Sequence, residues 1–133
     1  MWMPYCLTYF YVEIGSPEFD LADFCERLGL DYEMTERFST EDSMDLGRCE
    51  EFDPDINVSV RKTLDCFFGK EDILVELSEK YSLKYYLERV PIASSEEGYP
   101  YQRWSLDDDI IEFMYKTKTH DDLDYHIMGS HGE

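Results

Sequence analysis

The chain of 133 residues is long enough for one domain and too short for a second independent core, and its content of 43% hydrophobic and 16% aromatic residues excludes intrinsic disorder. Its 31 acidic and 12 basic residues give a formal net charge of −19, which excludes direct nucleic-acid binding and attraction to anionic membranes. Because no apolar run could span a bilayer and no basic segment precedes the most apolar stretch, we expect one cytoplasmic domain over residues 1–133.

Residues 5–14 predict a central strand, because they are rich in aromatic and β-branched residues and carry apolar side chains on both alternating faces. We expect this strand to be covered on both sides. A Gly-Ser-Pro turn follows it, and Ser16 or Asp20 can cap a helix whose apolar residues recur at helical spacing before Gly29. These features predict a first helix that ends at this glycine.

Residues 31–55 have a different character, with ten acidic and two basic residues and little hydrophobic periodicity. They predict a long surface loop, in which Tyr32, Met34 and Phe38 could anchor a short edge strand. Apolar and polar residues then alternate over residues 56–61, which predicts a half-buried strand.

The last third of the chain predicts a helix over residues 72–81, a strand over 84–90 closed by Pro91, a loop over 94–98, a helix capped by Ser105 and a strand over 122–128. Residues 129–133 are expected to form a frayed tail. This order of elements predicts an α+β fold, a single mixed β-sheet with about three helices packed largely on one face.

Four segments of this layout carry a resemblance to a known family. They are the opening strand Tyr9-Phe10-Tyr11-Val12-Glu13-Ile14-Gly15, a helix that begins at Phe19-Asp20-Leu21 and ends at Leu28-Gly29-Leu30, the helix and strand over residues 73–90, and the closing Leu123-Asp124-Tyr125. In them the chain resembles the bacterial family catalogued as domain of unknown function 4279. The resemblance implies the fold and no catalytic mechanism, and the acidic segment 31–55 departs from the family pattern.

Motifs for catalysis or metal binding are weak. The four cysteines lie about twenty residues apart without metal-ligand spacing, and we expect Cys6 and Cys25 to be buried. The acidic runs lack the glycine and the distal glutamate of a calcium loop, and the spacing of His120 and His126 does not suit two ligands on one helix face. We therefore expect no catalytic residue, no metal and no cofactor.

The excess of acid points instead to binding. We expect a non-enzymatic inhibitor that occupies a basic surface of a partner protein, such as a nuclease or another nucleic-acid-binding effector, where complementary charge speeds association. An anti-CRISPR or other phage anti-defence protein, or a toxin-immunity protein, fits this description. Two alternatives stay open: a small enzyme that uses carboxylates, and an accessory or scaffold domain whose acidity serves only solubility. The oligomeric state is also open.

The partner-binding residues expected from the sequence are acidic clusters and aromatic side chains near the last helix, because aromatic anchors flanked by acids are common at interfaces. The acidic residues are Glu33, Glu36, Glu41, Asp42, Asp45, Glu50, Glu51, Asp53, Asp55, Asp107, Asp108, Asp109, Asp121 and Asp122. The aromatic residues are Tyr99, Tyr101 and Trp104.

Overall fold

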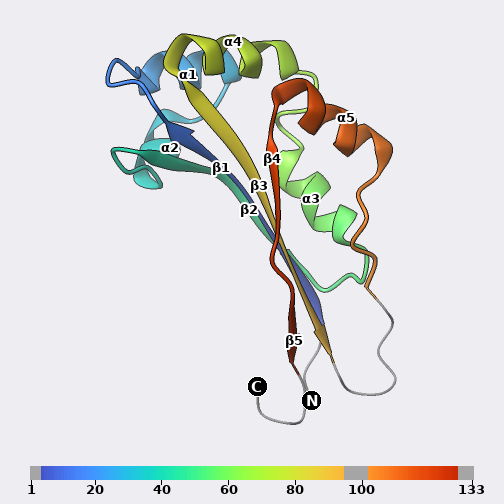
Figure 1. Ribbon diagram of the computed structural model, residues 1–133. Coiled ribbons are helices and arrows are strands. Elements are labelled where there is room, and N and C mark those ends of the chain that lie inside the picture. Colours follow the sequence, from blue (N-terminus) through green and yellow to red (C-terminus); the bar gives the residue numbers. More distant parts are fainter. Residues whose placement is uncertain (1–3, 95–101, 129–133) are drawn as a thin grey trace.

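The computed structural model describes residues 4–94 and 102–128. Its strands are β1 (Tyr5–Ile14), β2 (Ser43–Glu51), β3 (Leu83–Ser94), β4 (His120–Leu123) and β5 (His126–Met128). Its helices are α1 (Leu21–Leu28), α2 (Tyr32–Arg37), α3 (Ile56–Leu64), α4 (Glu71–Tyr81) and α5 (Asp108–Thr117). The α+β fold with one mixed sheet is confirmed, with five helices in the described part of the chain rather than about three (Figure 1).

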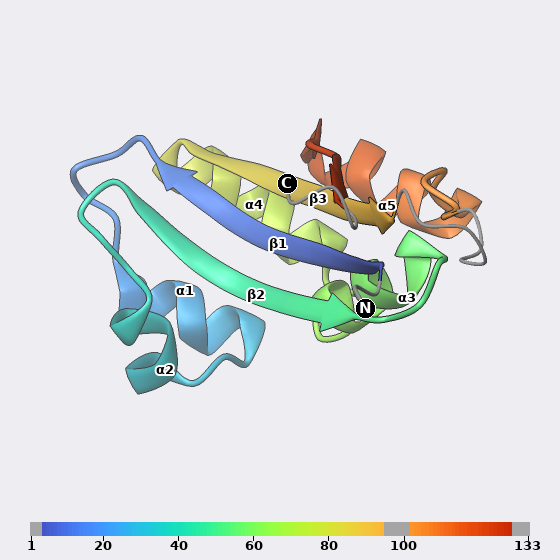
Figure 2. The same ribbon diagram turned by 90° about the horizontal axis from the view of Figure 1, so that it is seen from below.

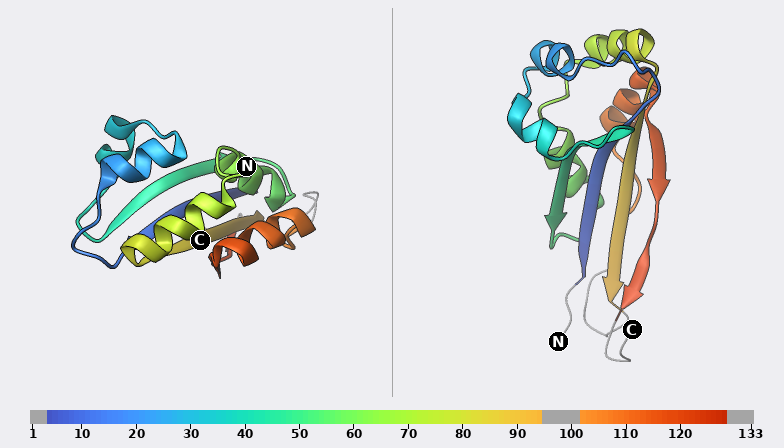
Figure 3. Two further views of the ribbon diagram at one scale, coloured as in Figure 1. Left: turned by 90° about the horizontal axis from the view of Figure 1, so that it is seen from above. Right: turned by 90° about the vertical axis from the view of Figure 1, so that its left-hand side faces the viewer.

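The sheet is built around the first strand. Its order is β2-β1-β3-β4, and β5 also pairs with β3, beyond the end of β4. The right-hand view of Figure 3 shows the four neighbouring strands in this order. β1 is antiparallel to both of its neighbours, whereas β4 and β5 are parallel to β3, which makes the sheet mixed.

The helices lie on one face of this sheet. Figure 2 looks onto the other face, with β1, β2 and β3 in front and α3, α4 and α5 behind them. Along β1, the residues that face the helices are fully buried (Cys6, Thr8, Phe10 and Val12), whereas the residues between them are only partly buried. The prediction that this strand is covered on both sides is therefore wrong, because the described helices supply a cover for one face only.

The first helix agrees with its sequence signals. The Asp20 side chain caps α1 by accepting a hydrogen bond from the Ala22 N–H at 3.0 Å, and Gly29 ends the helix with a φ of 71°. Phe24 and Leu28 carry the apolar face of α1 into the core, where Phe24 packs against Phe19.

The predicted surface loop over residues 31–55 is wrong, because this segment contains α2 and β2. The Asp31 carboxylate caps α2 by accepting from the Met34 N–H at 3.0 Å, and no residue of this helix is buried. A helix that buries nothing leaves no hydrophobic periodicity in the sequence. β2 pairs with β1 from Glu51 to Ser43, and the register shift leaves Leu46 as a bulge, so backbone hydrogen bonds stabilise a strand of acidic and polar composition.

The predicted strand over residues 56–61 is also wrong, because the segment forms α3. The Asp55 carboxylate caps this helix, and the apolar residues Ile56, Val60 and Leu64 are buried at a spacing of four. Small polar residues complete the buried side of the helix. Ser59 forms a hydrogen bond of 2.7 Å between its hydroxyl and that of Thr8 on β1. Tertiary packing thus decides between helix and strand where the apolar pattern suits both.

The last third follows the prediction with shifted boundaries. α4 forms as expected, but β3 continues through Pro91, whose nitrogen points to the gap between β4 and β5, where a missing N–H donor costs least. α5 has its N-cap at Asp107 rather than at Ser105, and the predicted last strand is divided into β4 and β5. The tail over 129–133 and most of the predicted loop at 94–98 lie outside the described residues.

Within residues 4–94 and 102–128, every helix is too short or too polar to cross a bilayer.

A pair of neighbouring substitutions tests the helical assignment of α3. Asn57 is 3% exposed, and its side chain accepts from the Asp107 N–H at 2.8 Å and donates to the Ser105 carbonyl at 2.9 Å. We expect Asn57→Ala to lower the free energy of unfolding by about 2–4 kcal/mol because buried polar groups lose their partners. Val58→Ala, on a half-buried position, should cost less than about 1 kcal/mol. Urea denaturation measures both, and a strand over this segment would give the reverse order.

Candidate functional site

The structure divides the acidic residues that the sequence predicts for partner binding into two groups. The first group has its carboxylates bound by basic side chains or backbone N–H groups: Glu51, Asp53, Asp55, Asp107, Asp109 and Asp121. The second group forms no ion pair with any described residue: Glu33, Glu36, Glu41, Asp42, Asp45, Glu50, Asp108 and Asp122. Carboxylates of the first group stabilise the fold, so the second group provides the charge that a partner could meet.

Two arginines bind half of the first group. Arg61 on α3 binds Asp107 and Asp109, each at 2.7 Å from its Nη2 atom. Arg103 binds Asp107 at 2.9 Å and Asp55 at 3.3 Å. The hydrogen bonds from Arg61 lower the pKa of Asp109 below its usual range. This network ties the start of α3 to the start of α5.

Asp121 belongs to a different structural ion pair. Arg89 on β3 is 6% exposed, and its guanidinium forms a fork with the Asp121 carboxylate, with 2.8 Å from Nε to Oδ1 and 2.7 Å from Nη2 to Oδ2. The same guanidinium donates to the Trp104 carbonyl. A buried cation without its carboxylate would be strongly unfavourable, so Asp121 fixes β4 to β3 rather than facing a partner.

Of the three aromatic residues chosen from the sequence, the structure describes only Trp104. Trp104 is half-buried and packs on Tyr125 with ring centroids 4.7 Å apart. Tyr99 and Tyr101 lie outside the described residues.

The open face of the sheet carries a row of stacked rings instead. Tyr11 on β1 and Tyr86 on β3 are register partners, and their rings stack with centroids 5.0 Å apart and 8° between their planes. Tyr86 stacks in turn on His120 of β4, with centroids 4.9 Å apart. On the other side, the Arg48 guanidinium of β2 lies 5.4 Å from the centroid of Tyr9. These rings and the Arg48 guanidinium thus come from all four neighbouring strands of the sheet.

Carboxylates surround these rings. Burial raises the pKa of Tyr11, and the charges of Glu88, Asp122 and Glu13, which belong to three different strands, raise it further. A hydrogen bond to Glu13 raises the pKa of Tyr86. Burial, followed by Asp122 and Asp124, raises the pKa of Glu88. We call this surface the tyrosine face, and its residues are Tyr9, Tyr11, Glu13, Arg48, Tyr86, Glu88, His120 and Asp122.

A shallow hollow lies beside the tyrosine face, toward β2. It has a volume of about 250 Å³, and its lining includes Tyr9, Tyr11 and Glu88 together with Phe38, which is 54% exposed, and Asp45. The Oδ1 atom of Asp45 is buried and has no hydrogen-bond partner among the described residues. Burial raises the pKa of Asp45, against the lowering effects of the Gly47 N–H and of Arg48.

This arrangement suits the binding of a planar cation. Stacked aromatic rings attract a guanidinium through their faces, and the surrounding carboxylates can accept its hydrogen bonds. A metal is less well served, because the described residues contain no group of three or more His, Cys, Asp or Glu side chains placed to hold one.

Sequence reasoning missed the tyrosine face for a specific reason. Tyr9 and Tyr11 belong to an apolar run, which led to the prediction of a strand that is covered on both sides. The strand alternates, however, so Phe10 and Val12 enter the core while the two tyrosines lie on the open face. The hydroxyl groups at alternate positions were the signal that could have separated the two faces.

Adjacent aspartates allow the division of acids to be tested. Asp121→Asn should lower the free energy of unfolding by roughly 1–3 kcal/mol, because the buried Arg89 guanidinium loses its charged partner. Asp122→Asn removes the same charge one residue later, on the tyrosine face, and should change stability by less than about 0.5 kcal/mol. Thermal and urea denaturation measure the stability of both variants. Equal losses of unfolding free energy in the two variants would contradict the division of the acids into two groups.

Asp45 predicts a dependence of stability on pH. Because its pKa is raised in the folded state, the folded protein binds more protons than the unfolded chain as this carboxyl titrates, and the wild type loses stability as pH rises through that range. Asp45→Asn removes this loss. The melting temperature of the variant minus that of the wild type should therefore increase between about pH 3 and pH 7.

Asp42→Asn, at an exposed position in the preceding turn, is the control for the general effect of one charge fewer. A difference for Asp45→Asn that stays flat, or that follows the Asp42→Asn difference, would show that burial of this carboxyl has no thermodynamic effect.

Comparison of the chain with protein-family models, with curated proteins and with solved structures finds no match. The resemblance to domain of unknown function 4279 stays a prediction. The functional argument therefore rests on the geometry of the tyrosine face.

Proposed function

We propose that the protein is a non-enzymatic binding protein whose tyrosine face docks on a basic surface of a partner protein. The observation that carries this proposal is the row of stacked rings from Tyr11 through Tyr86 to His120, with carboxylates beside it, on the sheet face that the described helices leave open. Burying such a surface against a complementary one would satisfy the charges and remove aromatic area from water.

A protein that carries arginine is the best match to this surface. The guanidinium is planar, so it can stack on the face of the Tyr11 ring that Tyr86 leaves open while donating to Glu13 or Glu88 beside it. Lysine can satisfy a carboxylate but gains less from the rings. The net charge of −19 adds a long-range attraction for a basic partner, which would accelerate association at low salt.

Nucleic-acid-binding proteins present basic surfaces of this kind. A partner of that class, such as a nuclease, would lose access to its nucleic acid while the tyrosine face occupied its basic channel. We therefore propose an inhibitor, of the anti-CRISPR or toxin-immunity type. The carboxylates that support this proposal are those of the tyrosine face, whereas the other acids of the second group add only long-range attraction.

Binding of an octa-arginine peptide tests the surface directly. Glu88→Gln combined with Asp122→Asn should weaken the affinity about fivefold, because two carboxylates beside the rings are lost. Glu33→Gln combined with Glu41→Gln removes the same charge from exposed positions away from the tyrosine face and is the matched control. Fluorescence anisotropy at low and at physiological ionic strength gives both affinities. Equal weakening by the two double variants would mean that the affinity for octa-arginine depends only on net charge, and would overturn the proposed site.

The rings have a separate readout. Tyr11→Leu should reduce the preference for octa-arginine over octa-lysine by about threefold, since leucine offers apolar contact without a π face. An unchanged preference would exclude stacking of a guanidinium on the row.

A test of inhibition requires a partner protein, which is captured from an extract of the source organism. Proteins captured by the wild type and lost by the Glu88→Gln, Asp122→Asn variant are assayed for nucleic-acid binding with and without the wild-type protein. We expect the wild type to displace the nucleic acid and the variant to fail. Captured proteins that keep their nucleic acid while the wild type is bound would rule out an inhibitor of this class.

A further inference from the structure

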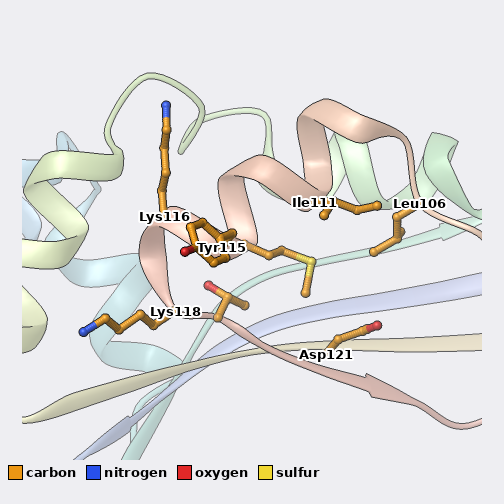
Figure 4. Close-up of a pocket in the computed structure, with 8 residues that line it drawn as sticks. Leu106, Ile111, Tyr115, Lys116, Lys118 and Asp121 are labelled. Carbon is orange, nitrogen blue, oxygen red and sulfur yellow. The ribbon is translucent and has the colours of Figure 1, made fainter.

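A groove lies between α5 and β4, on the opposite side of β4 from the tyrosine face. It has a volume of about 680 Å³, and its apolar lining includes Leu106, Ile111, Met114 and Tyr115. Figure 4 shows Ile111 and Leu106 in the space between the helix and the strand, while the Lys116 and Lys118 side chains point away from it. Ile111 is 51% exposed and Tyr115 is 85% exposed, so the apolar surface is open to solvent.

The floor of this groove is the edge of the sheet. Among the described residues β4 pairs only with β3, and all four of its residues are exposed. The Asp124 N–H donates to the Arg89 carbonyl at 2.9 Å, so even-numbered residues along β4 direct their backbone groups toward β3. The N–H and C=O groups of Asp121 and Leu123 therefore point outward, as an unpaired template for one more strand.

A strand added at this edge would meet different chemistry on its two sides. Side chains on its groove side would lie against Ile111 and Tyr115 of α5. Side chains on its other side would lie beside Asp122 and Asp124, where the tyrosine face ends. An extended segment that alternates apolar and basic residues is complementary to both sides.

We propose that β4 accepts an extended segment of the basic partner as an additional strand, with its apolar side chains in the groove against α5 and its basic side chains beside Asp122. The basic character of the occupant rests on the proposed function, whereas the pairing itself rests on the free edge and the groove. A second copy of this chain is a poor occupant, because antiparallel pairing of two β4 strands would bring together Asp121, Asp122 and Asp124 of both copies.

Peptides with and without backbone donors test strand addition on the wild-type protein. The probe is an octapeptide of alternating arginine and valine, and a peptide in which four arginines precede four valines has the same charge. The alternating peptide should bind about tenfold more tightly. Two further alternating peptides carry methyl groups on backbone nitrogens, one on its arginines and the other on its valines. Because only alternate N–H groups of an added strand face β4, one of these two peptides should lose the tenfold gain in affinity and the other should keep it. Equal affinities of the two methylated peptides would overturn the proposal.

A substitution in the protein provides the complementary test. Leu123→Pro removes one outward N–H from an edge strand, where proline is tolerated, and should weaken the alternating peptide about fivefold. Leu123→Ala keeps this N–H and is the matched control. Unchanged binding to a folded Leu123→Pro protein, confirmed by its melting curve, would also overturn strand addition.

Ile111→Ser combined with Tyr115→Ser should remove the preference for valine-containing peptides without changing the affinity for octa-arginine. Met34→Ser on α2, which is 51% exposed, is the control for loss of exposed apolar area. If Glu88→Gln with Asp122→Asn weakens octa-arginine binding, but Leu123→Pro leaves the affinity for the alternating peptide unchanged, the proposed function is sustained and the added strand is rejected. The opposite pair of results would sustain the added strand and reject the tyrosine face.

Discussion

The cover of helices on one side of the sheet is the constraint on which the other features depend. With α3 and α4 packed behind β1 and β3, alternate residues of each strand lie in different environments, one set in the core and the other on the open face. Phe10 and Leu87 meet across β1 and β3 within the core, while Tyr11 and Tyr86 meet on the other side of the same backbone. The open face must then remain compatible with water, and half-exposed tyrosines with carboxylates between them meet this condition.

Distribution of the basic residues follows from this layering. The chain has only 12 lysines and arginines for 31 acidic residues, and several of the arginines are bound within the fold. Arg61 and Arg103 neutralise carboxylates where α3 and α5 begin, and Arg89 lies almost completely buried against Asp121. The excess negative charge is therefore left on α2, on the turn before β2 and on the open face. Acidity in this protein has two roles: carboxylates paired with arginines organise the helix starts and β4, and carboxylates without an ion pair to a described residue shape the potential that a partner meets.

Local signals in the sequence were sufficient to predict the secondary structure of a segment where its pattern of burial and its backbone preference agree. α1 has a capping aspartate, an apolar stripe and a terminal glycine, and the alternating run of β1 fits a strand; both form as predicted. They were insufficient where tertiary contacts decide. Ile56 and Val60 satisfy a strand pattern and a helix pattern equally, and the small polar residues that seat α3 on β1 carry no hydrophobic signal. β2 is acidic because its stability comes from pairing with β1, which no local property of its own residues reports.

The same reasoning explains how much of the site could be foreseen. The excess of acid and the abundance of tyrosine are visible in composition, and both occur in the tyrosine face. The assignment of individual acids required coordinates, because Asp121 and Asp122 are neighbours of identical chemistry with opposite environments. The choice of face required the register of β1 with β3, which brings residues more than seventy positions apart into contact.

This long register has a consequence for the order in which the protein assembles. β1 is synthesised well before its antiparallel neighbour β3, which runs from Leu83 to Ser94. Pairing over such a sequence separation is entropically slow, so the apolar first strand spends the interval with only β2 available to it. The shorter connection therefore favours pairing of β1 with β2 before β1 pairs with β3. The acidic residues between these two strands would oppose aggregation of such a pair by charge repulsion.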